Sequence, residues 1–184
     1  MALKRVISNE RRTQIENEAN NILTQHNLMK VPVDPVALAN KLGIKVKNAV
    51  FSDDNISGLI AKRGTSITLL VNQNDPPTRK KFTIAHELGH HFLHLMSQEG
   101  EFVDRIENVD FLREEFLDET SSPERKKEVE ANYFAAALLM PRPLFEKAIE
   151  ISHDQESLAR MFNVSLTAVE NRMNTFNITP EINH

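Results

Sequence analysis

The sequence predicts an α+β protein in which a short antiparallel sheet is followed by two long helices and a final pair of short helices. Three observations carry this prediction. Residues 57–62 and 66–72 have the apolar and alternating patterns of strands on either side of a turn. Residues 79–96 and 122–140 have helical periodicity, and 154–173 divides into two short helical segments. A chain of 184 residues with 40% hydrophobic content can bury a substantial core.

The N-terminal third is expected to contain two packing helices. Residues 9–28 place apolar side chains at helical spacing, and the helix should end before the break around Pro32. Asp34 then has the residue type of a helix cap, Pro35 suits the first helical position, and Gly43 suits the end of a helix.

The predicted sheet comes next in the chain. A strand is expected at 44–50, and the strands at 57–62 and 66–72 should form a hairpin around Arg63-Gly64-Thr65. The hairpin edge would offer free backbone groups to which an extended peptide could add as a further strand. Asp75-Pro76-Pro77 breaks the chain before the next helix.

The run His86-Glu87-Leu88-Gly89-His90 predicts a zinc site on that helix. Because a helix turns by about 100° per residue, His86 and His90 lie within about 40° of each other and can reach one ion. Glu87 lies off that line, where it can hold a water molecule. Gly89 destabilises a helix by roughly 1 kcal/mol relative to alanine, which indicates that another backbone or a ligand passes close by.

A catalytic zinc ion needs a third protein ligand, and the chain has no cysteine, so nitrogen or oxygen must supply it. His94 lies eight residues after His86, about 12 Å along the axis, which is too far for convergence on one ion. We therefore expect His94 to support the site or to pack. His91 projects toward another face and is expected at the surface or at an interface.

The second long helix offers two carboxylates. Ser122 should cap this helix, and Pro141 should stop it. Glu128 and Glu130 point about 200° apart, so only one of them can face the metal. Glu128 is the predicted ligand because its stripe is small and apolar, whereas Glu130 follows Lys126 by one turn and is expected to be a solvated charge.

Two further residues of this helix are candidates for supporting roles. Asn132 lies one turn after Glu128, where it can hold that carboxylate in place. Tyr133 is the only tyrosine and is a candidate helper that would stabilise an oxyanion. The alternative for Tyr133 is an amphipathic helix residue with its hydroxyl at the surface.

Residues 154–173 are similar to a helix-turn-helix, with a turn at 163–165 and a second helix capped by Ser165. A DNA reader needs cations on its second helix, yet 166–173 offers only Arg172 beside Glu170. Residues 144–184 hold three basic side chains (Lys147, Arg160, Arg172) against six acidic ones (Glu146, Glu150, Asp154, Glu156, Glu170, Glu181). This balance disfavours DNA binding and favours packing or docking on a protein.

The charge and hydropathy of the whole chain favour a cytoplasmic protein with a protein partner. The formal charge is −4, which argues against broad binding to nucleic-acid phosphates. No run of eighteen apolar residues exists that would predict a membrane span. The sequence leaves the oligomeric state open.

Two stretches together resemble the ImmA/IrrE family of zinc metallopeptidases: 79–94, RKKFTIAHELGHHFLH, and 128–141, EVEANYFAAALLMP. The resemblance covers roughly residues 30–145, although 96–122 is longer than the linker of that family. It implies a zincin-like fold, zinc (Zn2+) on His86, His90 and Glu128, and Glu87 as the catalytic base. It also implies that the substrate is a helix-turn-helix (XRE-type) repressor whose cleavage releases transcription of mobile-element or stress genes.

The expected organisation is an N-terminal packing helix at 1–30, a zincin-like metallopeptidase domain at 31–143, and a helix-turn-helix-like segment at 144–184. Two other functions remain open at this point. One is a non-proteolytic regulator that binds a repressor or DNA through its C-terminal helices and uses zinc structurally. The other is the toxin of a toxin–antitoxin pair.

Overall fold

The computed structural model describes residues 4–5, 7–53, 56–95, 102–107, 116–117 and 122–178. Its elements are, in chain order, β1 (Lys4–Arg5), α1 (Asn9–Gln25), α2 (Pro35–Lys41), β2 (Lys45–Ala49), β3 (Ile56–Arg63), β4 (Ser66–Asn72), α3 (Pro77–His90), the π-helical turn η1 (His91–Leu95), β5 (Phe102–Glu107), β6 (Phe116–Leu117), α4 (Pro123–Leu139), α5 (Arg142–Ile151), α6 (Gln155–Phe162) and α7 (Leu166–Thr175). This mixture of helices and sheet confirms the predicted α+β class.

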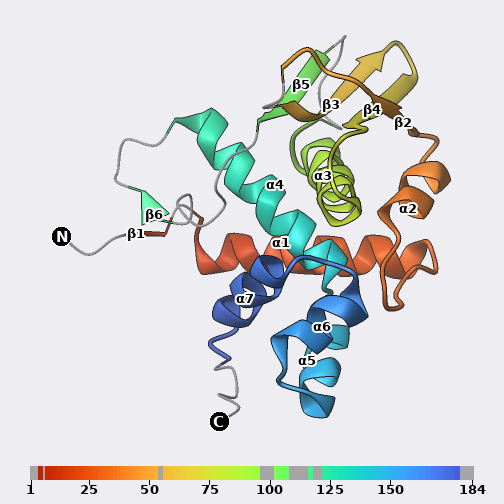
Figure 1. The fold of residues 1–184 in the computed structure, drawn as a ribbon. Coiled ribbons are helices and arrows are strands. Elements are labelled where there is room, and N and C mark those ends of the chain that lie inside the picture. Colours follow the sequence, from red (N-terminus) through yellow and green to blue (C-terminus); the bar gives the residue numbers. More distant parts are fainter. Residues whose placement is uncertain are drawn as a thin grey trace.

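The elements are stacked in layers around the crossing of α3 and α4 (Figure 1). The sheet covers one side of α3, with contacts from β3 and β4. Helix α4 packs against α3, and α1 packs against α4 from the other side. The C-terminal helices lie beyond α1, farthest from the sheet (Figure 1). The two longest helices that the sequence predicts after residue 75 therefore form the centre of the molecule.

The caps of the first two helices confirm their predicted starts. The Ser8 hydroxyl accepts a hydrogen bond from the backbone N–H of Arg11, so α1 begins at Asn9. The Asp34 carboxylate accepts from the N–H groups of Val36 and Ala37 at 2.9 and 3.1 Å. Gly43 follows α2 with φ +73, a conformation that glycine adopts without steric penalty.

The sheet contains the predicted hairpin, but it is mixed and not wholly antiparallel. Strands β3 and β4 pair antiparallel across a turn at Gly64, whose φ is +57. Strand β2 joins the outer side of β4 in parallel, with Lys45 opposite Thr68. The reason is the strand order β2-β4-β3-β5: the chain leaves β2, passes beyond β4 to form β3, and returns between them in the direction of β2.

The expectation that the hairpin has a free edge is wrong for β3, because β5 of the same chain pairs with it. Strand β5 runs antiparallel to β3, with Lys62 opposite Phe102 and Ile56 opposite Glu107. The pairing shifts register between Ile56 and Gly58. Most of the insertion expected between the two long helices lies outside the described residues, apart from β5 and from β6, which pairs with β1.

Helices α3 and α4 approach each other closely at Gly89. A Cβ atom on Gly89 would lie 3.1 Å from the Cα and 3.1 Å from the carbonyl oxygen of Ala131, and 3.2 Å from the Cβ of Phe134. The prediction that a second backbone passes this glycine is therefore confirmed. The close approach lets side chains from both helices meet.

A single apolar cluster runs through the described part of the chain. It includes Ile15 and Leu23 of α1, Leu88 of α3, Phe134 of α4 and Phe162 of α6. Buried side chains from 1–30, 31–143 and 144–184 share this cluster, and the division of the chain into those three segments stays a prediction. Among the described residues, no helix has both the length and the apolar character needed to cross a membrane.

The C-terminal segment has the predicted helix-turn-helix form. Asn163 ends α6 in the left-handed conformation, with φ 53, and the Ser165 hydroxyl accepts from the N–H of Ala168 at the start of α7. The Lys81 ammonium on α3 donates to the carbonyl oxygens of Phe162 and Asn163 at 2.8 and 3.3 Å. The turn is thereby attached to the helix that carries the histidines.

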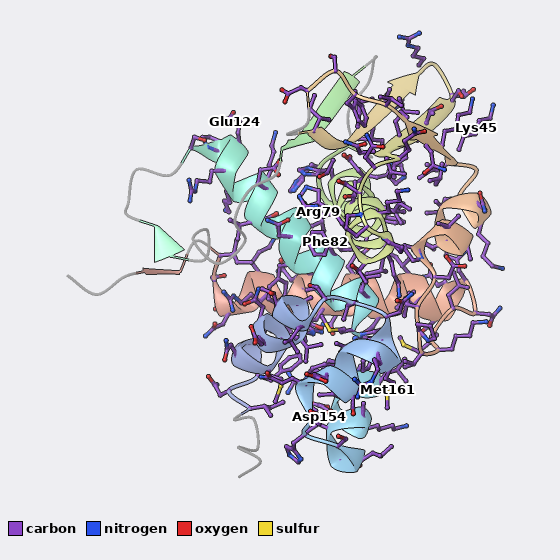
Figure 2. The ribbon with its side chains drawn as sticks, viewed as in Figure 1. Lys45, Arg79, Phe82, Glu124, Asp154 and Met161 are labelled. Carbon is purple, nitrogen blue, oxygen red and sulfur yellow. The ribbon has the colours of Figure 1, made fainter. Side chains whose placement is uncertain are left out.

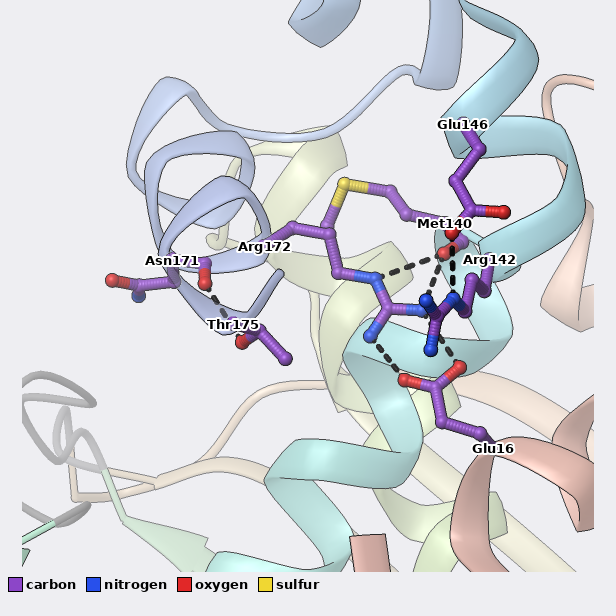
Figure 3. Close-up of polar contacts among 7 residues, drawn as sticks. All are labelled: Glu16, Met140, Arg142, Glu146, Asn171, Arg172 and Thr175. Carbon is purple, nitrogen blue, oxygen red and sulfur yellow. Dashed lines mark hydrogen bonds and ion pairs between the residues drawn. The ribbon is translucent and has the colours of Figure 1, made fainter. Parts of the chain in front are cut away.

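Arg172, the only cation of α7, is buried against α1 (Figure 3). Its guanidinium donates to both carboxylate oxygens of Glu16, at 2.5 and 2.9 Å, and to the carbonyl oxygen of Met140. Only 1% of Arg172 is exposed, so this cation is not presented to a phosphate. Helix α5, which precedes α6 and α7, is not among the helices expected from the sequence, although Leu144, Phe145 and Ala148 have helical spacing.

We predict that Gly89→Ala destabilises the protein by about 1–3 kcal/mol, because the added methyl group overpacks the contact with Ala131. Helix propensity alone would give the opposite sign, a gain of about 1 kcal/mol. Urea denaturation in the presence of a chelator measures the difference. Asn17→Ala on the exposed face of α1 is the control, and a Gly89→Ala protein as stable as its parent would contradict the close packing.

Candidate metal centre

Three side chains converge where α3 crosses α4. The Nε2 atoms of His86 and His90 are 2.8 Å apart. The Glu128 carboxylate reaches across from α4, with one oxygen 3.3 Å from His86 Nε2 and the other 3.2 Å from His90 Nε2. One ligand atom from each residue lies within 4.8 Å of the others. The structure thus brings together the three residues that the sequence selects as metal ligands.

The two imidazoles are deeply buried, whereas the carboxylate opens toward solvent. His86 and His90 are 1% and 3% exposed, but 37% of the Glu128 side chain is accessible. The ring of Phe82, one turn before His86 on α3, lies 6.2 Å from the His86 ring (Figure 2). A metal ion held here would therefore have an apolar wall on one side and would be approached from the side of Glu128.

Asn132 forms a hydrogen bond with His86, and its expected role in holding Glu128 stays a prediction. Its Oδ1 atom accepts a hydrogen bond from His86 Nδ1 at 2.6 Å. Both Glu128 and Asn132 face α3. Glu128 lies on the Nε2 side of the His86 ring, and Asn132, one turn later on α4, lies on the Nδ1 side. Because Asn132 Oδ1 can only accept, Nδ1 of His86 carries a proton, and Nε2, the nitrogen that points toward Glu128 and His90, is the one that would bind a metal.

The electrostatics of the cluster favour the forms that bind metal. Burial raises the pKa of Glu128, but the interactions of its carboxylate with the two imidazoles outweigh that effect and hold the pKa well below its usual value of 4.5. Burial lowers the pKa of His86, although Glu128 opposes that change. Near neutral pH the carboxylate is therefore ionised and the His86 ring neutral, as metal binding requires.

Glu87 is fully buried beneath β3. A Cβ atom on Gly58 would lie 3.6 Å from Glu87 Oε1, and it would overlap Thr83. The absence of a side chain at Gly58 therefore allows the strand to lie over this part of α3. Glu87 directly follows the candidate ligand His86 in sequence, and it lies where β3 crosses α3.

The other two histidines of this region lie outside the three-residue group. His94 follows α3 in η1, its ring centroid is 5.5 Å from that of His90, and its Nε2 donates to the carbonyl oxygen of Lys127 at 3.3 Å. His91 is half-buried against Phe92, and burial lowers its pKa. His94 thus lies beside the candidate ligands, as expected of a supporting residue.

Glu130 is not the solvated charge that its spacing from Lys126 indicated. It is 5% exposed, and its carboxylate binds Arg11 of α1 at 2.6 Å. The expectation is wrong because α1 covers this side of α4, which helical periodicity within α4 does not reveal. Arg11 is therefore a neighbour of the site that the sequence did not single out.

Tyr133 faces α1. Arg12 lies over its ring, 5.2 Å from the centroid. Burial and the nearby Glu16 carboxylate raise the pKa of Tyr133 to about 12. These partners are not those of a surface hydroxyl, and they lie on the side of α4 that faces α1, whereas Glu128 faces α3.

Comparison with known proteins identifies the family. The model of the IrrE N-terminal-like domain (Peptidase M78) matches residues 39–174. The chain belongs to this family. The matched range contains both helices of the metal centre and the helix-turn-helix-like segment of this IrrE-like domain.

Two known proteins are similar to parts of this chain. A propionyl-CoA carboxylase regulator of Cereibacter sphaeroides is 48% identical over 46 residues, which cover 24% of this chain and 10% of that protein. The structure of a Mycobacterium tuberculosis transcriptional regulator has a TM-score of 0.61 and 21% identity over 88% of this chain and 46% of that one. The second likeness shows a shared fold. This chain spans less than half of the length of either relative.

We expect His86→Ala, His90→Ala and Glu128→Ala each to abolish stoichiometric metal binding, because each removes one of three protein ligands. Glu130→Gln should retain one ion per chain. Elemental analysis after dialysis measures both results. Loss of the ion from Glu130→Gln with retention in Glu128→Ala would reverse the assignment of the third ligand.

We predict that the single tyrosine titrates near pH 12 in the folded protein and near 10 after unfolding. Since the folded-state pKa is the higher one, the associated stability is complete below about pH 10 and is lost as the pH rises toward 12. Near-ultraviolet titration of the phenolate reports Tyr133 alone, because the chain has no tryptophan. Tyr133→Phe should remove this alkaline dependence and leave metal binding intact, and a folded-state midpoint near 10 would contradict the burial.

Proposed function

We propose that this protein is a zinc-dependent endopeptidase that cleaves a helix-turn-helix (XRE-type) repressor and so derepresses mobile-element or stress genes. The observation that carries the proposal is the convergence of His86, His90 and Glu128 with Glu87 adjacent on α3. Two imidazoles and one carboxylate are a ligand set of catalytic zinc, which keeps a fourth position open. A structural site would be closed by a fourth protein ligand.

Each residue of the candidate site has a separate role in the proposed hydrolysis. Zinc held by the three ligands would supply the Lewis acidity that lowers the pKa of a water molecule and polarises a peptide carbonyl. Glu87 would accept the proton of the attacking water and return it to the departing amine. Asn132 keeps His86 in the ligating tautomer through the 2.6 Å hydrogen bond to Nδ1. The exposed side of Glu128 leaves room for a peptide.

A protein substrate fits the character of the C-terminal helices. Arg172 of α7 forms a buried ion pair with Glu16. The guanidinium of Arg160 in α6 lies 3.3 Å from the Glu156 carboxylate and 3.7 Å from that of Asp154. The single cation of α6 and that of α7 are therefore each paired with a carboxylate of the chain. The relatives are named as regulators, which supports a repressor as the partner. A repressor acts on DNA, so the proposal places this protein in the cytoplasm.

The regulator names also support a second candidate function. In it, the protein binds a repressor without cutting it, and the metal serves structure only. The two candidates differ in what they require of Glu87. Binding alone would not need a carboxylate at that position, whereas hydrolysis would.

The test is co-expression with a helix-turn-helix (XRE-type) repressor, which we expect to be encoded near this gene. The parent should cut the repressor, and Glu87→Gln should reduce cleavage by about 10²–10⁴-fold while retaining one zinc ion per chain, because a proton carrier is lost and no ligand is removed. Immunoblotting of the repressor and mass spectrometry of its fragments measure cleavage.

Glu124→Gln is the matched control, because it makes the same change of side chain at the exposed first turn of α4, away from the crossing with α3 (Figure 2). That variant should cleave like the parent. Equal cleavage by Glu87→Gln would exclude the proposed mechanism, and tight binding of an intact repressor by the parent would favour the non-proteolytic alternative.

A further inference from the structure

Two ion pairs connect α1 to other helices of the chain, and each contains at least one buried side chain. Glu16 pairs with Arg172 of α7, in the C-terminal segment. Arg11 pairs with Glu130 of α4, two residues after the proposed metal ligand Glu128. The second pair joins the first turn of α1 to the helix that carries Glu128.

Burial of the Glu130 carboxylate is costly, and Arg11 is the part-exposed partner that compensates its charge. The Glu130 side chain is 6% exposed and that of Arg11 is 32% exposed. Removing a carboxylate from water carries a penalty of several kcal/mol, and buried ion pairs contribute little net stability relative to apolar side chains. Their best-attested use is to fix one arrangement of packed elements against its alternatives.

The arrangement fixed here is the rotation of α4 about its own axis. Glu128 and Glu130 project about 200° apart on the helix. Arg11 holds Glu130 on the side of α1 at 2.6 Å, and this leaves Glu128 on the side of α3, 3.2–3.3 Å from the two imidazoles. A rotation that released Glu130 would also move the Glu128 carboxylate away from His86 and His90.

His94 connects the same pair to the other helix. Its Nε2 lies 3.9 Å from Glu130 Oε2 and 3.3 Å from the carbonyl oxygen of Lys127. Its ring lies 5.5 Å from that of His90. A continuous set of contacts therefore runs from Arg11 through Glu130 and His94 to a candidate ligand, and it involves all three helices.

We propose that Arg11 is a positioning residue of the metal centre, which acts through Glu130 to hold α4 at the rotation where Glu128 meets both histidines. This inference rests on the proposed ligand set. It assigns to the N-terminal helix a role in metal affinity, although α1 contributes no ligand. The Glu16–Arg172 pair holds the same helix elsewhere and has no contact of this kind with the ligands, so it provides a matched comparison.

The test measures zinc affinity by competition with a chromophoric chelator. Arg11→Met keeps the aliphatic bulk and removes the charge, and it should weaken zinc binding about 10–100-fold, the range found when groups that orient ligands are lost. The visible spectrum of the Co²⁺-loaded protein should change as well, because the carboxylate geometry changes. Glu16→Gln, which breaks the other buried pair of α1, should leave both the affinity and the spectrum like those of the parent.

Two further variants separate positioning from loss of folding. Arg11→Lys should recover part of the affinity, since it restores the charge without the planar fork of arginine. Arg11→Met combined with Glu130→Gln should weaken zinc binding by less than the product of the two single effects, because both remove one interaction. Far-ultraviolet circular dichroism at the same temperature establishes that each variant is folded.

The outcomes distinguish this inference from the proposed function. Unchanged affinity in folded Arg11→Met, or an equal loss in Glu16→Gln, would overturn the positioning role even if the parent cleaves the repressor. Weaker zinc binding in Arg11→Met with the changed Co²⁺ spectrum would establish the role even if no repressor is cleaved.

Discussion

The close crossing of α3 and α4 is the constraint on which the rest of the structure depends. Gly89 lets the backbone of Ala131 approach so closely that a methyl group at residue 89 would be crowded. At this separation a carboxylate from α4 can reach two imidazoles of α3. The sheet packs against α3 and α1 packs against α4, so neighbouring elements hold both helices of the crossing in place.

Three polar contacts in the interior each join side chains from two different elements. Asn132 of α4 orients His86 of α3, Arg11 of α1 holds Glu130 of α4, and Arg172 of α7 holds Glu16 of α1. A buried charge without a partner would be strongly destabilising, so these pairs specify how the helices are arranged. The first two of these interactions lie beside the candidate metal centre, and the third attaches α7 to α1.

The C-terminal helices illustrate that a shape does not define a function. Helices α6 and α7 form a helix-turn-helix, yet Lys81 binds the end of α6 and Glu16 binds the one cation of α7. The segment is built into the protein through interactions with α3 and α1. A role in packing or in contact with a protein partner follows from this use of its charges, as the acidic balance of residues 144–184 predicts.

The sequence by itself determined the features that depend on neighbours along the chain. Helical spacing placed His86 and His90 on one face, capping residues placed the starts of α2 and α4, and the turn at Gly64 placed the hairpin. The choice of Glu128 over Glu130 also rested on periodicity, and the structure brings Glu128 to the histidines. Only the tertiary structure decided the partners of Glu130, Asn132 and Tyr133, the parallel pairing of β2, and the strand that covers β3. The physical reason is that these contacts join residues distant in the chain, and local periodicity shows which way a side chain points on its own helix but not which element is packed there.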